Sequence, residues 1–417
     1  MSHSASLSRY RAALTAPGAL VPALAAIVGR LPIAMIGLAL LFYVQRGTGS
    51  FAVAGMVSAG ALVGVAAGSV LQGRLMDRFG ATHPLLAMSA LFAAAVAVTV
   101  VAVERREPAP VLVGLAFAVG SSQPMVGSSS RALWGRLLPA GPVRNAGYAY
   151  EAISMEVFFI LGPGLAGVLS LSGWWPGTGV VAGAAGMIAG VVSFALTPAV
   201  RGWGPDLDRG HLGPLGAVAS PGMRTMAIAA FGFGIAIGFV EVAVPAAATL
   251  AGHAAMGGVL LSLWSVGSVA AGVVYGVRPW PRPAHLRPPA LLLGFSLLLP
   301  LLAVPTGLVG MALALLVVGT LITPQATTLS AMIDTVAPAG TSAEAFGWVV
   351  TAITLGLAAG QSTSGALVES AGPASAFLAA AVSGLLLAAV VWLRRATLHA
   401  APPSDQPTTR DRTFAAA

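Results

Sequence analysis

Apolar residues occur in twelve long runs along the chain, separated by short polar or proline-containing stretches. Most runs approach the roughly 20 residues that an α-helix needs to cross the hydrocarbon core of a bilayer. The strands of a β-barrel would instead alternate apolar and polar positions over about 10 residues. The pattern therefore predicts an all-α membrane protein with twelve transmembrane helices, near residues 18–44, 51–72, 84–103, 109–134, 146–171, 177–199, 224–250, 255–277, 289–304, 307–333, 345–368 and 373–393.

The longest polar interruption follows the sixth run and is rich in Gly and Pro. It divides the predicted helices into two groups of six. We therefore predict, in order, a cytoplasmic N-terminal tail, a first six-helix bundle, a cytoplasmic linker, a second six-helix bundle and a disordered cytoplasmic tail, at residues 1–17, 18–200, 201–222, 223–396 and 397–417.

Two segments of the first group recur in the second. Residues 139–153 align with 338–353, and residues 54–73 align with 257–276, each at the same helix number of its group. Many transporters are built from related halves with the substrate site between them. The repeats therefore predict two pseudo-symmetric bundles.

The positions of the basic residues explain the net charge of +8. All 21 basic residues are Arg; if the N-terminus is cytoplasmic, 17 lie in inner segments, three in outer loops, and Arg30 lies within a helix. This is the bias that orients helices during insertion. We attribute the basicity to topology rather than nucleic-acid binding, and we expect an inner-membrane protein with both termini cytoplasmic.

Candidate cofactor and metal ligands are scarce. The chain has no Cys, which excludes disulfides and thiolate sites, and its six His lie in tails or loops. No nucleophile, base and orienting group can be placed together, and Gly-rich phosphate loops are absent. We therefore expect neither an enzyme nor a nucleotide-driven pump, and no cofactor or metal.

The loop after the second run, GRLMDRFGATHP at 73–84, has the spacing G-x-x-x-D-R-x-G. In this it resembles the major facilitator superfamily, over about residues 10–396. The resemblance implies two six-helix bundles around a central cavity that opens alternately to either side. The corresponding second-half segment, GVRPWPRPAH at 276–285, has no acid, which argues against a symmetrical pair of latches.

The acid of this loop can pair with Arg or cap the positive end of a neighbouring helix. Its two glycines allow close backbone approach. Asp334 and Glu344 lie at the inner ends of the tenth and eleventh runs, where Arg74 or Arg78 can pair with them. We predict that a conformational latch contains Gly73, Asp77, Arg78, Gly80, Arg131, Asp334 and Glu344.

The fifth run contains ILGPGLAG at 160–167, which is similar to the glycine–proline motif of exporters in the superfamily, although Phe158 replaces an expected glycine. Three other segments, GRLP at 29–32, YAYEAISMEVFFILGP at 148–163 and EAFGW at 344–348, together resemble an efflux-type subgroup abundant in actinobacteria. This resemblance implies export.

Acids inside the apolar runs are the candidates for proton coupling, because an acid at the bilayer centre costs at least about 2.5 to 3.5 kcal/mol on insertion scales. Glu156 lies near mid-depth, Arg30 lies at a similar level, and we predict that the two pair. The alternatives are a permanent structural ion pair and direct contact with a cationic substrate. Glu151 is a coupling candidate or an edge partner of Arg131, Arg136 or Arg144; Glu241 contacts a proton or cation, or forms an outer-gate hydrogen bond.

Uncharged polar groups at mid-depth are the predicted substrate contacts: Gln123, Gln325 and Gln361. Gln123 and Gln325 adjoin Pro124 and Pro324 at corresponding places of the two halves, where a proline frees backbone carbonyls. Trp264 and Phe158 can supply an aromatic wall, or else pack in the helix bundle.

These features predict a proton-linked secondary transporter that exports a small amphipathic organic compound. Its partners are the small-molecule substrate, protons and the lipid bilayer, and we expect a monomer. An importer of the same fold is the alternative. A membrane sensor is disfavoured because the linker is too short for a signalling domain.

Overall fold

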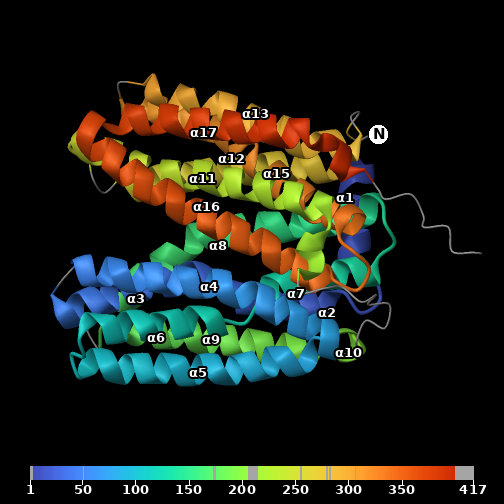
Figure 1. The fold of residues 1–417 in the computed structure, drawn as a ribbon, viewed down its shortest axis with the longest axis horizontal. Coiled ribbons are helices and arrows are strands. Elements are labelled where there is room, and N and C mark those ends of the chain that lie inside the picture. The colour runs from blue at the N-terminus through green and yellow to red at the C-terminus, as the bar shows by residue number, and fades with distance from the viewer. Residues whose placement is uncertain are drawn as a thin grey trace, which may run out of the picture.

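Helices make up all the regular structure in the described part of the chain (Figure 1). The computed structural model describes residues 3–49, 51–171, 175–204, 215–253, 256–278, 280, 283–305 and 307–399. The first half of the chain forms one bundle and the second half forms another beside it. This confirms the predicted all-α fold of two helical bundles.

The long helices of the first bundle are α2 (Leu20–Arg30), α3 (Ile33–Thr48), α4 (Phe51–Phe79), α5 (Thr82–Glu104), α6 (Ala109–Ser122), α7 (Val126–Leu137), α8 (Pro142–Leu171) and α9 (Thr178–Ala195). Those of the second are α11 (Pro221–Leu250), α12 (Met256–Val277), α13 (Arg287–Leu298), α14 (Leu308–Gly319), α15 (Ile322–Val336), α16 (Ser342–Ala371) and α17 (Pro373–Leu393). Shorter elements are α1 (His3–Leu14), α10 (Pro198–Arg201), η1 (Gly216–Ala219), η2 (Ala284–Leu286), η3 (Leu299–Ala303) and η4 (Arg395–Leu398).

Twelve crossings result from these helices. In the described ranges, eleven helical segments are long and apolar enough to span a membrane. The remaining predicted run, the fifth, is α8, whose 30 residues extend about 45 Å. It carries three charged residues, Arg144, Glu151 and Glu156.

Four crossings are built from two consecutive helical pieces, and three of the interruptions coincide with prolines. Pro32 separates α2 from α3, Pro124 separates α6 from α7, and Pro300 lies where α13 becomes η3. Proline lacks the N–H that continues the helical hydrogen-bond ladder. Pro324 instead lies in the first turn of α15. Backbone N–H groups in a first turn have no partner within the helix, so the missing N–H of this proline breaks no helical hydrogen bond.

Glycines set the same close helix packing in both halves. In the first bundle, a methyl group at Gly64 of α4 would overlap the carbonyl oxygen of Phe117 in α6. In the second, a methyl group at Gly267 of α12 would overlap the carbonyl oxygen of Leu316 in α14. The sequence repeat aligned these two glycines, so the structure confirms that the halves are related.

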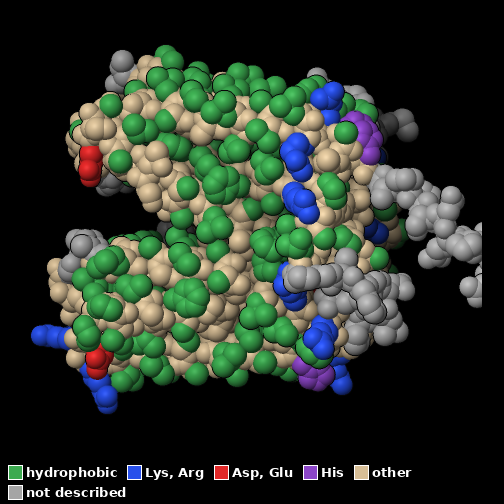
Figure 2. Space-filling model, in the orientation of Figure 1, with side chains coloured by type: hydrophobic (Ala, Val, Ile, Leu, Met, Phe, Trp, Pro, Cys, Tyr) green, Lys and Arg blue, Asp and Glu red, His purple; other side chains and the backbone are tan. Residues whose placement is uncertain are grey.

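The bundles meet mainly through α4 against α16 and α8 against α12, with α15 also packing on α8. Most of the basic side chains visible in Figure 2 lie at one end of the molecule. We call this the Arg-rich end; it contains Arg74, Arg78, Arg136 and Arg144. At the opposite end a notch separates the two halves in the same view.

The predicted tails and linker are partly described. The predicted N-terminal tail, 1–17, contains the helix α1. The predicted linker, 201–222, contains η1 and the first residues of α11, and its residues 205–214 lie outside the described part. Residues 400–417 of the predicted C-terminal tail also lie outside it.

Candidate functional site

Asp77 closes the Arg-rich end by capping a helix of the other half. It is fully buried, and its carboxylate accepts the backbone N–H of Ala343 at 3.0 Å and of Glu344 at 2.8 Å. Both N–H groups belong to the first turn of α16, where the helix leaves them without partners and carries partial positive charge. One carboxylate therefore ties the end of α4 to the start of α16.

Glu344 adds an ion pair to this contact. Its carboxylate lies 3.0 Å from Arg74 Nε and accepts the Ala217 N–H at 3.0 Å and the Trp348 indole N–H at 3.2 Å. The predicted pairing of Glu344 with Arg74 is confirmed. Arg78 lies over the ring of Phe79, 5.2 Å from its centroid.

Asp334 has other partners than those predicted. Its carboxylate accepts hydrogen bonds from Arg144 at 2.8 Å and from the Tyr148 hydroxyl at 3.0 Å, both at the start of α8. The prediction that Arg74 or Arg78 pairs with Asp334 is wrong. These bonds still join the two halves at the Arg-rich end, as the latch prediction requires.

Close backbone approach completes the closure. A methyl group at Gly73 would lie 2.6 Å from the Ala343 carbonyl oxygen, so α4 and α16 touch here through their backbones. One turn deeper, the Ser69 hydroxyl lies 2.6 Å from the Thr351 hydroxyl. Gly80 has φ +78°, which permits the turn into α5.

The predicted Arg30–Glu156 pair is wrong, because Arg30 pairs with Glu151. Both side chains are fully buried. The second Arg30 amino group donates to Ser154 at 2.7 Å, and Glu151 accepts from Ser130 at 2.7 Å and from the Trp134 indole at 2.9 Å. The carboxylate thus joins α2, α7 and α8 inside the first bundle.

The start of α8 explains this error. The apolar run placed it near residue 146, but the helix begins at Pro142. At 1.5 Å per residue Glu151 is therefore about 14 Å along α8 and Arg30 about 15 Å along α2. The earlier start brings Glu151 to the level of Arg30, and it places Glu156 about 6 Å further along the helix than predicted.

Two other predicted site residues lie beside this ion pair. Arg131 is partly exposed and close enough to Arg30 and Glu151 for their charges to interact. Phe158 is buried, with its ring centroid 5.6 Å from the Arg30 guanidinium carbon. In this conformation Phe158 packs within the bundle, which is the alternative to a substrate-facing wall.

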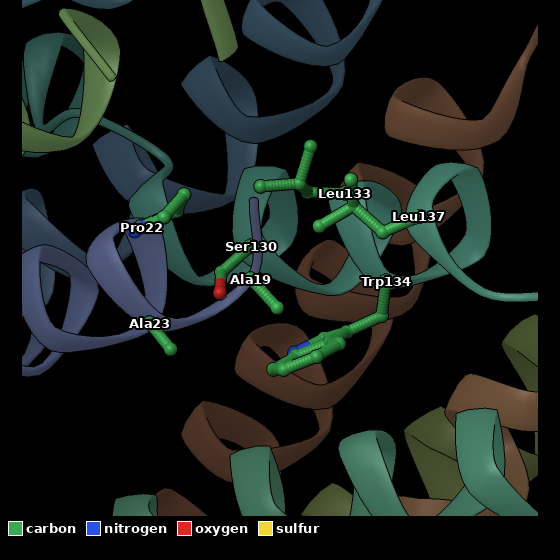
Figure 3. Close-up of a pocket in the computed structure, with 7 residues that line it drawn as sticks. All are labelled: Ala19, Pro22, Ala23, Ser130, Leu133, Trp134 and Leu137. Carbon is green, nitrogen blue, oxygen red and sulfur yellow. The ribbon is translucent and has the colours of Figure 1, made fainter. Parts of the chain in front are cut away.

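A shallow depression between α2 and α7 adjoins the pair (Figure 3). It is lined mainly by apolar side chains, together with Ser130 and Trp134, and has no space for a water molecule. Because of its size, we do not assign substrate binding to it.

Glu156 lies at the contact between the halves. The hydroxyl groups of Ser265 and Ser268 in α12 face its carboxylate, and the charge of Glu241 acts on it. Among the described residues, no Arg forms an ion pair with it. A carboxylate of the first half is thus held by hydroxyl groups of the second.

The hydroxyl groups lead on to the broken tenth crossing. Ser268 Oγ lies 2.8 Å from Thr323 Oγ1 and accepts the Thr323 N–H at 3.1 Å, in the first turn of α15. The start of a half-helix points its positive end towards this group. Gln325, one position beyond Pro324, is fully buried, and its amide has no hydrogen-bond partner within the described residues.

The Glu241 carboxylate accepts a hydrogen bond from Gln361 Nε2 at 2.9 Å, which links α11 to α16. Both side chains are partly exposed. Trp264 is 6% exposed and packs edge-to-face on Phe295, so it belongs to the core of the second bundle in this conformation.

Gln72 is a residue that the sequence interpretation missed. Its amide donates to the carbonyls of Ser121 at 3.0 Å and Gln123 at 2.9 Å, and accepts the Met125 N–H at 3.1 Å. It therefore satisfies three backbone groups freed by the break at Pro124, and so fixes the position of Gln123. The sequence did contain a signal for it, because Gln72 is an isolated amide in the glycine-rich apolar run that forms α4.

A sequence model of the Major Facilitator Superfamily matches residues 22–360. The chain belongs to this superfamily. No curated protein matches the sequence. As a member of the Major Facilitator Superfamily it is a transporter of multi-pass membrane architecture rather than an enzyme.

Several solved transporter structures share the fold at low identity. The human organic anion transporter MFSD10 (TETRAN) has a TM-score of 0.70 at 17% identity, covering 92% of this chain and 99% of that one. A bacterial homologue of the iron transporter ferroportin, in an outward-facing state, has a TM-score of 0.68 at 16% identity, covering 91% of this chain and 99% of that one. The proton:xylose symporter XylE has a TM-score of 0.69 at 16% identity, covering 90% of this chain and 95% of that one. At such identities the likeness extends to the fold alone.

Proposed function

We propose that this protein exports a small amphipathic organic compound in exchange for protons, by alternating access. The observation that carries the proposal is Glu156, a carboxylate deep in the bundle that faces hydroxyl groups of the opposite half and has no Arg partner in the described part of the chain. Acids at this depth are functional by default because their placement is costly.

The two acids Glu156 and Glu241 explain how exchange can work. They come from opposite halves and their charges interact. A carboxylate can hold a proton or a cationic group of the substrate, but not both together. Protons arriving from outside therefore displace a cationic substrate, and substrate arriving from the cytoplasm displaces protons.

Sidedness follows from the basic residues. We propose that the Arg-rich end is cytoplasmic, since inner loops of inner-membrane proteins carry the excess of Arg and Lys. The Asp77 and Arg144 contacts then make up a closed inner gate, and the notch at the other end opens to the outside. Both termini are cytoplasmic in this arrangement.

The substrate class follows from the surroundings of the two acids. Besides these carboxylates, the candidate contacts Gln123, Gln325 and Gln361 are neutral, and the flanking helices are apolar. Such a site suits an apolar amine better than a sugar or a phosphate. Export is supported by the glycine–proline segment at 160–167.

The test is uptake into inverted membrane vesicles across a panel of apolar amines, neutral analogues and carboxylates. We expect an acidic lumen to drive uptake of amines, and a proton uncoupler to abolish it. Accumulation only in right-side-out vesicles would instead establish import. Absence of proton-dependent movement of any compound in either orientation would refute the proposal.

A further inference from the structure

The N-terminal helix α1 contacts both halves at the Arg-rich end (Figure 1). It packs on α8 of the first half and also reaches α12 of the second. The Tyr10 hydroxyl donates a hydrogen bond to the carbonyl oxygen of Gly272 in α12 at 3.3 Å. This single bond links segments 262 residues apart in the sequence.

The contact with α12 depends on two glycines one helical turn apart. A methyl group at Gly276 would overlap the Tyr10 hydroxyl and lie 3.0 Å from Ala149 Cβ of α8. A methyl group at Gly272 would lie 3.0 Å from Ile153 Cγ1, also of α8. Helices α1, α8 and α12 therefore meet at one point, through the bare backbone of α12.

Tyr10 is suited to hold this contact. It is half-buried, and burial raises the pKa of Tyr10 to about 12. Its hydroxyl therefore keeps its proton at physiological pH and remains a donor. A neutral hydrogen bond of this kind is weak enough to break and re-form during each transport cycle.

The contact lies on the side of the gate where the loop latch is missing. Asp77 ties α4 to α16 on one side. The corresponding second-half segment, 276–285, has no acid that could tie its neighbours in the same way. On the α8–α12 side, a bond from α1 crosses between the halves next to this segment, in addition to the bonds from Arg144 and Tyr148 to Asp334.

We propose that α1 is an additional gate latch: Tyr10 holds α12 against α8 while the Arg-rich end is closed, and it must release Gly272 for that end to open. This goes beyond the proposed function and does not depend on the identity of the substrate or the direction of transport. It requires only that the two halves move apart at this end.

The test uses the absence of Cys from the chain. The parent protein carries Ser69→Cys, a buried position whose side chain meets α16, so a thiol there reacts with a maleimide when the Arg-rich end opens. We expect Tyr10→Phe to raise the labelling rate about two- to twelve-fold, the range corresponding to one neutral hydrogen bond. Deletion of residues 2–14 should raise it further.

Tyr43→Phe is the matched control. The Tyr43 hydroxyl donates to Glu104 at 2.7 Å within the first half, so its loss removes a tyrosine hydrogen bond without touching the gate. We expect the parent labelling rate in this variant. Parent rates in both Tyr10→Phe and the deletion, or an equal rise in Tyr43→Phe, would overturn the proposal.

Discussion

The two glutamates of α8 should respond in opposite ways to the same substitution. Glu151→Gln removes the charge that neutralises Arg30, and both side chains are fully buried. Removing one partner of a buried ion pair costs about 3–5 kcal/mol, because the other charge is left without compensation. Glutamine can still accept from Ser130 and Trp134, so the loss arises mainly from Arg30.

Glu156→Gln provides the comparison within the same helix. The hydroxyls of Ser265 and Ser268 can rotate to donate to or accept from an amide, and no Arg in the described residues loses an ion pair. We expect a change below about 1 kcal/mol, the net contribution of a typical hydrogen bond.

The assay is unfolding in mixed micelles with increasing denaturing detergent, followed by circular dichroism. A double-mutant cycle adds Arg30→Met: the double variant Arg30→Met/Glu151→Gln should be more stable than the sum of the single losses predicts. An equal loss of stability in Glu151→Gln and Glu156→Gln, or additivity of Arg30→Met with Glu151→Gln, would refute the assignment of Glu151 as the structural acid.

Three further changes test the gate and the broken fourth crossing. Asp77→Asn removes the negative charge at the start of α16, where a helix cap contributes about 0.5–2 kcal/mol. We therefore expect the rate of conformational cycling to change more than the substrate affinity. A turnover rate equal to that of the wild type would count against the latch. Gly73→Ala places a methyl group 2.6 Å from the Ala343 carbonyl oxygen, so the Arg-rich end should close less often, as measured by labelling of a gate cysteine; unchanged labelling would contradict the close approach. Gln72→Leu leaves three backbone groups without their side-chain partner and should lower the free energy of unfolding in the detergent assay by about 1–3 kcal/mol or more. An unchanged stability would mean that water replaces the amide.

Much of the fold could be predicted from local sequence. The apolar runs gave the crossings because a bilayer requires about 20 apolar residues per helix, and this constraint acts within each segment. The aligned glycines Gly64 and Gly267 showed the related halves, since both let a neighbouring backbone approach. The helix α1 was missed because a polar surface segment carries no such constraint.

The partners of charged groups were harder to predict because they depend on small shifts in helix start. The predicted start of α8 was four residues too late. As a result Glu156 was predicted to pair with Arg30, whereas Glu151 is the residue that does so. Likewise Asp334 was correctly placed near the end of its helix, but its partner Arg144 lies 190 residues away in the sequence, in the other half. Depth can be read from one helix, whereas pairing requires the packing of several.

Transport-linked proton movement in proteoliposomes tests the central claim about Glu156 most directly. Once a substrate is identified, a pH-sensitive dye should report proton flux against substrate flux in the wild type. We expect Glu156→Gln to lose this proton flux and pH-driven accumulation while retaining substrate counterflow; Glu369→Gln, an exposed acid at the end of α16, should behave as wild type. Wild-type proton flux in Glu156→Gln would contradict the claim that this carboxylate carries the proton.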